Sequence, residues 1–318
     1  MRLRRTALAV ITVFAISAAL FAAGTARAVT IGFAQVGTES DWRTAFSADM
    51  KAEAARRGIT LLFADADNDA TRQRDQVLGF VAAHVDAIVI APVAVTSWTE
   101  TLQKVRAAGI PVFLADRAVD ADPSLFVARI AADFNLEGRL AGAWLAQATR
   151  GACGILELQG NVGSEPAIQR HKGFLAVISQ FPNMRILHSV VGNFTSDGGK
   201  QAMEGFIHNP DGLKDVCAVW SHNDNMLLGA IAAMHAAGLH PGHDQLMVSV
   251  DGVPDIFRAM LAGDSNMSVE LKSDIGKYIF DVVQGYLSGR RDYPKWVLIP
   301  SALHTPADAA TALAGHGF

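Results

Sequence analysis

The chain has 318 residues, half of them hydrophobic, and a formal net charge of −4 at pH 7. A chain of this length and apolar content can bury a sizeable core in one or two domains, which excludes an intrinsically disordered protein. The slight acidic excess leaves no basic face for neutralising phosphates, which excludes a nucleic-acid-binding protein.

The first 28 residues have the pattern of a secretory signal peptide. Arg2, Arg4 and Arg5 precede an apolar stretch at 7–23, which is followed by the small-residue motif Ala26–Ala28. We predict cleavage after Ala28, and Arg4-Arg5 also allows a twin-arginine export route. The alternative, an uncleaved membrane anchor, is disfavoured because the apolar stretch is shorter than the ~20 residues that a bilayer span needs. Removing these residues leaves 23 basic against 31 acidic side chains, so the mature protein is expected to be acidic. No cysteine lies near the cleavage site, where a lipid-anchored protein would need one, so the product is expected to be free in the periplasm.

Apolar runs and amphipathic stretches alternate along the first part of the remaining chain. The runs suit buried parallel strands at Thr30–Ala34, Thr60–Phe63, Ala87–Ala91 and Val112–Ala115. Helical periodicity lies between them, at Trp42–Arg57, Thr71–His84 and Ser97–Ala108. This alternation predicts a βαβ series with a parallel sheet.

A second series of the same kind follows Asp133. Its strands are predicted at Ile155–Leu158, Arg185–Val191, Cys217–Trp220 and Leu246–Val250. Its helices are predicted at Asn135–Thr149, Pro166–Ser179, Asp197–Ile207 and Asn225–Ala237. Two series of similar length imply two lobes that face each other across a cleft, rather than one very wide sheet.

The chain is expected to cross between these lobes three times, near Ile130–Asp133, near Glu270–Asp274 and after Pro294. The first lobe would then comprise residues 29–132 and 273–294, and the second lobe residues 133–272 and 295–318. Several crossing segments would act as a hinge that lets the lobes close around a ligand.

The two cysteines of the chain, Cys153 and Cys217, each open a predicted strand of the second series. The first and third strands of such a series are neighbours, and an oxidising compartment favours disulfides. We therefore predict a Cys153–Cys217 disulfide, with two separate buried thiols as the alternative.

Several predicted strands deliver a polar side chain at their carboxyl ends, where open parallel sheets bind ligands. These side chains belong to Asp116 with Arg117, Asn223, Asp251 and Glu270. Together with Arg170, they offer the planar donors and acceptors that can hold the hydroxyls of a monosaccharide. Asp116-Arg117 alone could equally be a local ion pair at a strand end.

Aromatic residues stand in the loops that should face the cleft. Trp42 and Arg43 begin the first helix directly after Glu39 and its loop, and Phe194 has the matching loop position in the second lobe. Either ring could stack on the C–H face of a sugar, although packing within a lobe is the alternative for both.

Signatures of enzymes and metal sites are missing or weak. The sequence has no Gly-x-Ser-x-Gly elbow, no Gly-Lys-Ser/Thr phosphate loop and no His-Glu-x-x-His motif. His240 and His243 lie in a Pro/Gly turn without a second ligand cluster. No catalytic residue, cofactor or metal is therefore expected.

The chain resembles the type I periplasmic sugar-binding proteins of ABC importers, in the ribose- and galactose-binding group, and within it the galactofuranose binders. The stretches that carry the resemblance are Ile31–Arg43, Ile110–Arg117, Glu157–Gly160, Arg170–Phe174, Ser221–Asp224 and Ser249–Ile256. It implies two Rossmann-like lobes hinged by three crossings, and a monomer that gives its sugar to an inner-membrane permease and its ATPase. Matched position by position, it implies ligand contacts from Gln35, Glu39, Trp42, Arg43, Asp116, Arg117, Arg170, Phe194, Asn223, Asp251 and Glu270.

The group's ribose binders place two aromatics where this chain has Asp41-Trp42, and a glutamine where it has Glu270. These departures favour galactofuranose or a related hexose or pentose over ribose.

Three other functions use similar features. Asp116, Asp251 and Glu270 could be the carboxylates of a glycoside-processing enzyme, but arginines and an asparagine nearby would keep them ionised and so disfavour a general acid. A sugar-responsive repressor would need a DNA-binding helix pair where this chain has an export signal. Presentation of the bound sugar to a chemoreceptor or sensor kinase is compatible with import.

Overall fold

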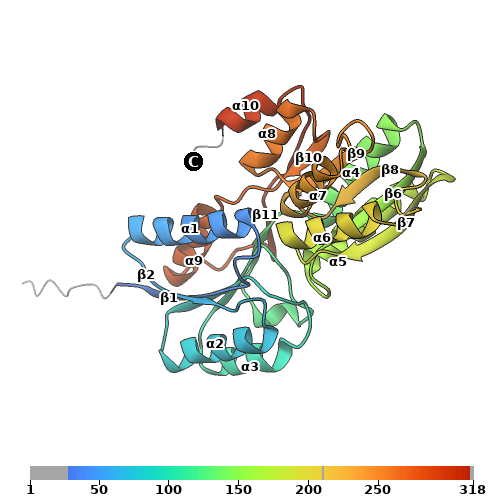
Figure 1. Ribbon diagram of the computed structural model, residues 1–318. Helices are drawn as coiled ribbons and strands as arrows, with labels where there is room; N and C mark the ends of the chain where they lie inside the picture. The colour runs from blue at the N-terminus through green and yellow to red at the C-terminus, as the bar shows by residue number, and fades with distance from the viewer. Residues whose placement is uncertain (1–27, 210, 316–318) are drawn as a thin grey trace, which may run out of the picture.

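The computed structural model describes residues 28–209 and 211–315, which form two α/β lobes joined by a narrow waist (Figure 1). The predicted signal peptide, except for its last residue, lies outside the described residues. Each lobe is one six-stranded sheet with helices on both faces, as the alternating sequence pattern predicts.

The sheet of the first lobe has the strand order β2-β1-β3-β4-β5-β11, with every neighbouring pair parallel. Helices α1 and α9 cover one face of this sheet and α2 and α3 cover the other (Figure 1). The elements of the first lobe are β1 (Thr30–Gln35), α1 (Asp41–Arg56), β2 (Thr60–Asp65), α2 (Ala70–Ala82), β3 (Ala87–Ile90), α3 (Thr99–Ala107), β4 (Val112–Ala115), the short 3-10 helix η1 (Pro123–Leu125), β5 (Arg129–Ala131), α9 (Gly276–Leu287) and β11 (Trp296–Leu298).

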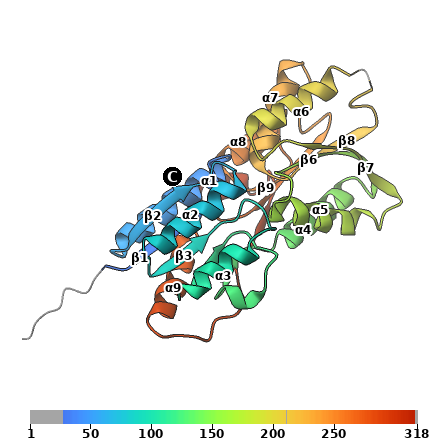
Figure 2. The same cartoon turned by 90° about the horizontal axis from the view of Figure 1, so that it is seen from below.

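The second sheet repeats this order as β7-β6-β8-β9-β10-β12, and only its last pair, β10 and β12, is antiparallel. Helices α4 and α5 lie on one face of the sheet and α6 and α7 on the other (Figure 2). The elements of the second lobe are α4 (Phe134–Ala148), β6 (Ala152–Gln159), α5 (Glu165–Ile178), β7 (Asn183–Val191), α6 (Ser196–Ile207), β8 (Val216–Ser221), α7 (Asp224–Ala236), β9 (Leu246–Asp251), α8 (Pro254–Ala262), β10 (Met267–Glu270), β12 (Ala302–His304) and α10 (Ala309–Gly315).

The central strands are buried because helices cover both of their faces. Every residue of β3 and β4 is buried, whereas the edge strand β2 is partly exposed. This explains why the central strands read as continuous apolar runs rather than as alternating patterns. The predicted strands and helices of both series are confirmed, to within a few residues at their ends.

The third crossing lies later in the chain than the sequence suggests. Residues 296–298 form β11, which pairs in parallel with β5 at the edge of the first sheet. The chain therefore leaves the first lobe after Leu298, not after Pro294, and 295–298 belong to the first lobe. The prediction was wrong because a three-residue edge strand with partly exposed side chains has no buried apolar run to mark it.

Cys153 and Cys217 form the predicted disulfide. They lie on the paired strands β6 and β8, with a Cα–Cα distance of 5.5 Å, which is in the usual range for a disulfide. The two cysteines that it joins are 64 residues apart in the chain.

Among the described residues, no helix is both long enough and apolar enough to cross a membrane.

Candidate functional site

A small cavity lies between the two lobes, at the carboxyl ends of strands from both sheets. It is lined by side chains of both lobes and of the second crossing: Glu39, Ser40, Trp42, Arg43, Asp116, Arg117, Phe134, Pro166, Arg170, Phe194, Asn223, Asp251 and Leu271. The structure thus brings together all the predicted ligand residues except Gln35 and Glu270. This is the position at which open α/β sheets bind ligands.

Gln35 lies beneath the cavity rather than in its wall. Its side chain is fully buried at the end of β1, where Nε2 donates to Ser47 Oγ at 2.9 Å and Oε1 accepts from the Val36 amide at 2.9 Å. Arg43 approaches the same Oε1 atom at 3.5 Å. Gln35 therefore contacts Arg43, which lines the cavity, and is not itself among the lining residues.

Glu270 faces a neighbouring pocket of about 380 Å³ between α1 and the second crossing. Its Oε2 atom lies 3.2 Å from His304 Nε2 on β12, and His304 Nδ1 lies 2.8 Å from Asp308. Leu271, one residue further, lines the interlobe cavity instead. The strand-end pattern located the right segment but not the residue that reaches the cavity.

Four charged side chains of the first lobe form a buried, alternating cluster. Arg43 donates to Asp116 Oδ2 at 2.7 Å, and Arg117 donates to Glu39 Oε1 at 3.3 Å. Longer ion pairs of 3.7 Å join Arg43 to Glu39 and Arg117 to Asp116, and each side chain is at most 4% exposed. Burial lowers the pKa of Arg117 to about 10, so its guanidinium stays charged at neutral pH.

Each member of this cluster has one buried polar atom without a hydrogen bond to any described residue. These atoms are Glu39 Oε2, Arg43 Nε, Asp116 Oδ1 and Arg117 Nε. Buried polar atoms without partners are costly, so natural structures rarely keep several together. Two acceptors and two donors on residues that line one cavity suit a ligand that carries several hydroxyl groups.

Arg170, on α5, is an arginine of the second lobe that lines the cavity. Its guanidinium donates to Glu137 Oε2 at 2.9 Å, to Asp251 Oδ1 at 3.3 Å and to the carbonyl oxygen of His222. Burial raises the pKa of Asp251 well above its ordinary value, although the Arg170 charge opposes this. Asn223 caps α7 by accepting from the Met226 amide, and its amide group donates to the Phe194 carbonyl.

Two predicted aromatic residues face the cavity from opposite lobes. Trp42 is 4% exposed and donates its indole N–H to the Leu271 carbonyl, while the Arg43 guanidinium lies 4.7 Å from its ring centre. Phe194 is 3% exposed and lies 5.6 Å from the Arg117 guanidinium across the lobe boundary. Both rings are thus buried at the cavity, in contact with the arginines that line it.

Gly160 lies directly against the Phe194 ring, and a Cβ atom there would collide with it. We expect Gly160→Ala to displace the ring and weaken sugar binding about tenfold, which calorimetry would measure. Val162→Ala is the matched control, because Val162 is in the same loop and is 80% exposed. Equal affinity of Gly160→Ala and the control would contradict a role for the Phe194 position.

The two lobes also contact each other directly around the cavity. Asp41 and Asn225 exchange two hydrogen bonds, of 3.1 and 2.9 Å, and Asn161 donates to Asn68 at 3.0 Å. These contacts leave a cavity of only about 20 Å³ between the lobes. The structure is therefore a closed arrangement, and the lobes must separate before a sugar-sized ligand enters.

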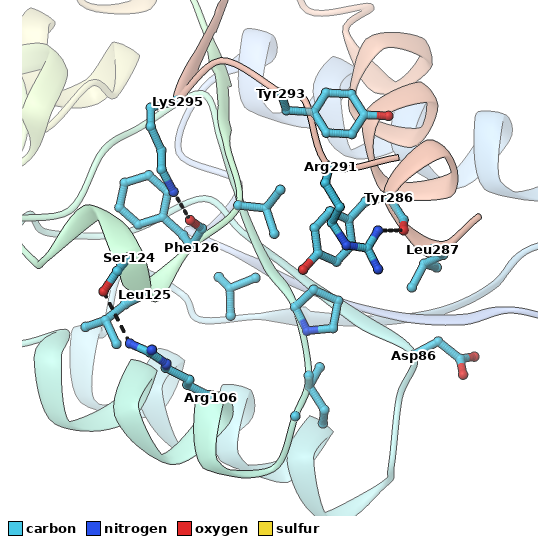
Figure 3. A pocket seen from close by; sticks show the side chains of 15 residues that line it. Asp86, Arg106, Ser124, Leu125, Phe126, Tyr286, Leu287, Arg291, Tyr293 and Lys295 are labelled. Carbon is cyan, nitrogen blue, oxygen red and sulfur yellow. Dashed lines mark hydrogen bonds between the residues drawn. The ribbon is translucent and has the colours of Figure 1, made fainter. Parts of the chain in front are cut away.

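A larger pocket of about 720 Å³ lies at the opposite end of the first sheet, beside the start of β4 (Figure 3). Two of its cations lie near helix ends: Arg106, in the last turn of α3, donates to Ser124 Oγ, and Arg291 donates to the Tyr286 carbonyl near the end of α9. Cations at helix carboxyl ends stabilise the helix dipole. These contacts give the cations a structural role, at the end of the sheet that is not used for ligands in such folds.

Sequence reasoning missed several residues that shape the cavity. Phe134 and Leu271 line it from the chain crossings, and Glu137 holds Arg170 from one turn further along α4. Phe134 immediately follows the first predicted crossing, which could have drawn attention to it. Within the described part of the chain, no group of three or more His, Cys, Asp or Glu side chains is arranged to hold a metal ion.

Comparison with known proteins gives a consistent result. Residues 31–291 match the family model described as a periplasmic binding protein domain. The chain is 45% identical to the galactofuranose-binding protein YtfQ of Escherichia coli (strain K12) over 303 residues, which cover 95% of each chain.

Solved structures agree with this match. A crystal structure of a galactofuranose binding protein superposes with a TM-score of 0.88 at 45% identity, covering 90% of this chain and 97% of that one. The periplasmic component of the arabinose ABC transporter from Shewanella sp. ANA-3, bound to α- and β-L-arabinofuranose, has a TM-score of 0.86 at 47% identity and covers 91% and 99%. The chain therefore belongs to the family of periplasmic binding proteins.

Proposed function

We propose that this protein captures a monosaccharide, galactofuranose or a closely related hexose or pentose, in the cavity between its lobes. It then delivers the sugar to an inner-membrane ABC permease driven by an ATPase. Its relatives support this proposal, because proteins 45% and 47% identical to this chain are described as galactofuranose-binding or as bound to arabinofuranose.

The observation that carries the proposal is the set of four buried polar atoms without hydrogen bonds, on Glu39, Arg43, Asp116 and Arg117. A ligand rich in hydroxyl groups would satisfy both the acceptors and the donors, which an apolar ligand would not. We therefore assign direct ligand contacts to these residues and to the other predicted residues that line the cavity.

The charges around the cavity favour a neutral ligand. Glu39, Asp116 and Asp251 supply three carboxyl groups, and Arg43, Arg117 and Arg170 supply three guanidinium groups. An anionic sugar, such as a sugar phosphate, would disturb this balance. Catalysis forms no part of the proposal, because the relatives are described as binding proteins and because arginines hold the carboxyl groups.

We further propose that the protein is exported, that residues 1–28 are removed, and that it acts as a monomer in the periplasm. The Arg-rich and apolar sequence of these residues supports export. The Cys153–Cys217 disulfide supports an oxidising compartment.

A thermal-shift screen against pentoses and hexoses tests the proposed function. We expect the bound sugar to raise the melting temperature, since a ligand at about 1,000 times its Kd stabilises the folded state by about 4 kcal/mol. The ring form is tested with 5-deoxygalactose, which can close only to a furanose, and 4-deoxygalactose, which can close only to a pyranose. Absence of stabilisation by every sugar would refute the function, and stabilisation by the pyranose analogue alone would refute the furanose assignment.

A further inference from the structure

We propose that Glu137 and Ser301, neither of which lines the cavity, position Arg170 and link it to the third interlobe crossing. This inference rests on the proposed function, because Arg170 is one of the residues assigned there to the sugar. Glu137 and Ser301 would then set the affinity for the sugar without contacting it.

Glu137 is a fully buried carboxyl group on α4 with a partner for each oxygen atom. Its Oε2 atom accepts from Arg170 Nε at 2.9 Å, and its Oε1 atom accepts from Ser301 Oγ at 3.0 Å. A single buried carboxyl group thus joins a residue of the cavity to a residue of the hinge.

The Glu137 contact restricts a side chain that would otherwise have many conformations. A free arginine side chain loses much rotamer entropy when it is fixed. Arg170 is held by Glu137 on one edge and by Asp251 and the His222 carbonyl on the others. Its guanidinium is therefore oriented before a sugar arrives, which reduces the cost of binding.

Close packing of α4 and α5 brings Glu137 and Arg170 together. Gly138, next to Glu137, touches the backbone of Arg170, and Gly173 on α5 touches the backbone of Asn135. A Cβ atom at either glycine would collide with a carbonyl oxygen of the other helix. The two charged groups therefore meet where the helices come nearest to each other.

Ser301 connects the third crossing to the Glu137–Arg170 pair. It lies between β11 of the first lobe and β12 of the second, in the crossing that begins at Ile299. The Ile299 amide donates to the Ala131 carbonyl at 2.9 Å, which holds this crossing beside the first one. Hinge rotation changes the backbone angles of such crossing segments, so the Ser301–Glu137 hydrogen bond depends on the angle between the lobes.

Substitution of Ser301 tests the link between the hinge and Arg170 by itself. It removes the Ser301–Glu137 hydrogen bond but leaves the Glu137–Arg170 ion pair in place. We expect Ser301→Ala to weaken binding of the sugar identified by the screen about fivefold, with the melting temperature of the free protein within about 2 °C of wild type. Ser301→Thr retains the hydroxyl and should restore the affinity. The matched control is Ser273→Ala, on the second crossing, which should bind as wild type.

A double-mutant cycle with Glu137→Gln supplies a readout that a merely structural role would not change. If Ser301 acts through Glu137, Ser301→Ala should lose most of its effect on affinity in the Glu137→Gln background. Should Glu137→Gln fail to fold, the difference in sugar affinity between Ser301→Ala and Ser301→Thr tests the inference without it.

The outcomes separate this inference from the proposed function. A wild-type protein that binds no sugar would refute the function itself. A wild-type protein that binds sugar, with a Ser301→Ala variant of equal affinity, would refute only the link between the hinge and Arg170.

Discussion

Replacing Asp116 with alanine is expected to weaken sugar binding about 100-fold while leaving the protein folded. Asp116 lines the cavity, accepts from Arg43 at 2.7 Å and has a second oxygen atom without a hydrogen bond. Hydrogen bonds to charged groups contribute about 1.5–3 kcal/mol each, so their loss corresponds to one to two decades in affinity. Isothermal titration calorimetry with the sugar found in the screen would measure the change.

Two further variants control this experiment. Asp116→Asn keeps an acceptor oxygen and suits the backbone, because φ is +66° here and asparagine tolerates this region better than alanine. Its affinity should fall between those of wild type and Asp116→Ala. Asp120→Asn removes an exposed carboxyl group four residues away and should bind normally. Wild-type affinity in a folded Asp116→Ala variant would show that the carboxyl group has no part in binding.

The substitution Gly173→Ala is expected to lower the free energy of unfolding by about 3 kcal/mol. The added methyl group would meet the Asn135 carbonyl oxygen at the contact of α4 with α5, where neither backbone can move easily. Overpacking of this kind costs about 1–3 kcal/mol, and a rigid backbone contact falls at the upper end of that range. Urea denaturation followed by circular dichroism would give the difference.

Gly205→Ala is the matched control, because Gly205 also lies within a helix but has open space where a Cβ atom would stand. Alanine is the better helix former, so this variant should gain up to about 1 kcal/mol of stability. If Gly173→Ala proved as stable as Gly205→Ala, the close helix contact would not constrain the fold as described.

The sequence predicted the fold well because its signals were local. Continuous apolar runs such as Ala87–Ile90, separated by helical patterns, are typical of strands in the middle of a parallel sheet, and the intervening helices restrict the topology. The strand β11 escaped prediction because its three residues, Trp296–Leu298, lie at a partly exposed edge. Their place in the sheet depends on pairing with β5, which comes from a distant part of the chain.

The candidate site was predicted in outline, because residues after parallel strands gather at one edge of the sheet. The direction of each side chain was harder to predict, since it depends on neighbours from other elements. Gln35 is turned away by Ser47, and Glu270 is engaged by His304. Glu137 could not be identified in sequence as a partner of Arg170, because a glutamate on a helix usually faces solvent.

The last two strands of the chain, β11 and β12, determine when the two sheets can be completed during synthesis. β11 and β12 supply the final edge of the first and second sheet, and both come from residues 296–304. Neither lobe can complete its sheet until almost the whole polypeptide has left the ribosome, because an earlier chain exposes the unpaired backbone of β5 and β10. Translation that stops short of Trp296 would therefore leave β5 and β10, which are largely buried in the complete protein, as new sheet edges that can pair with foreign strands and aggregate.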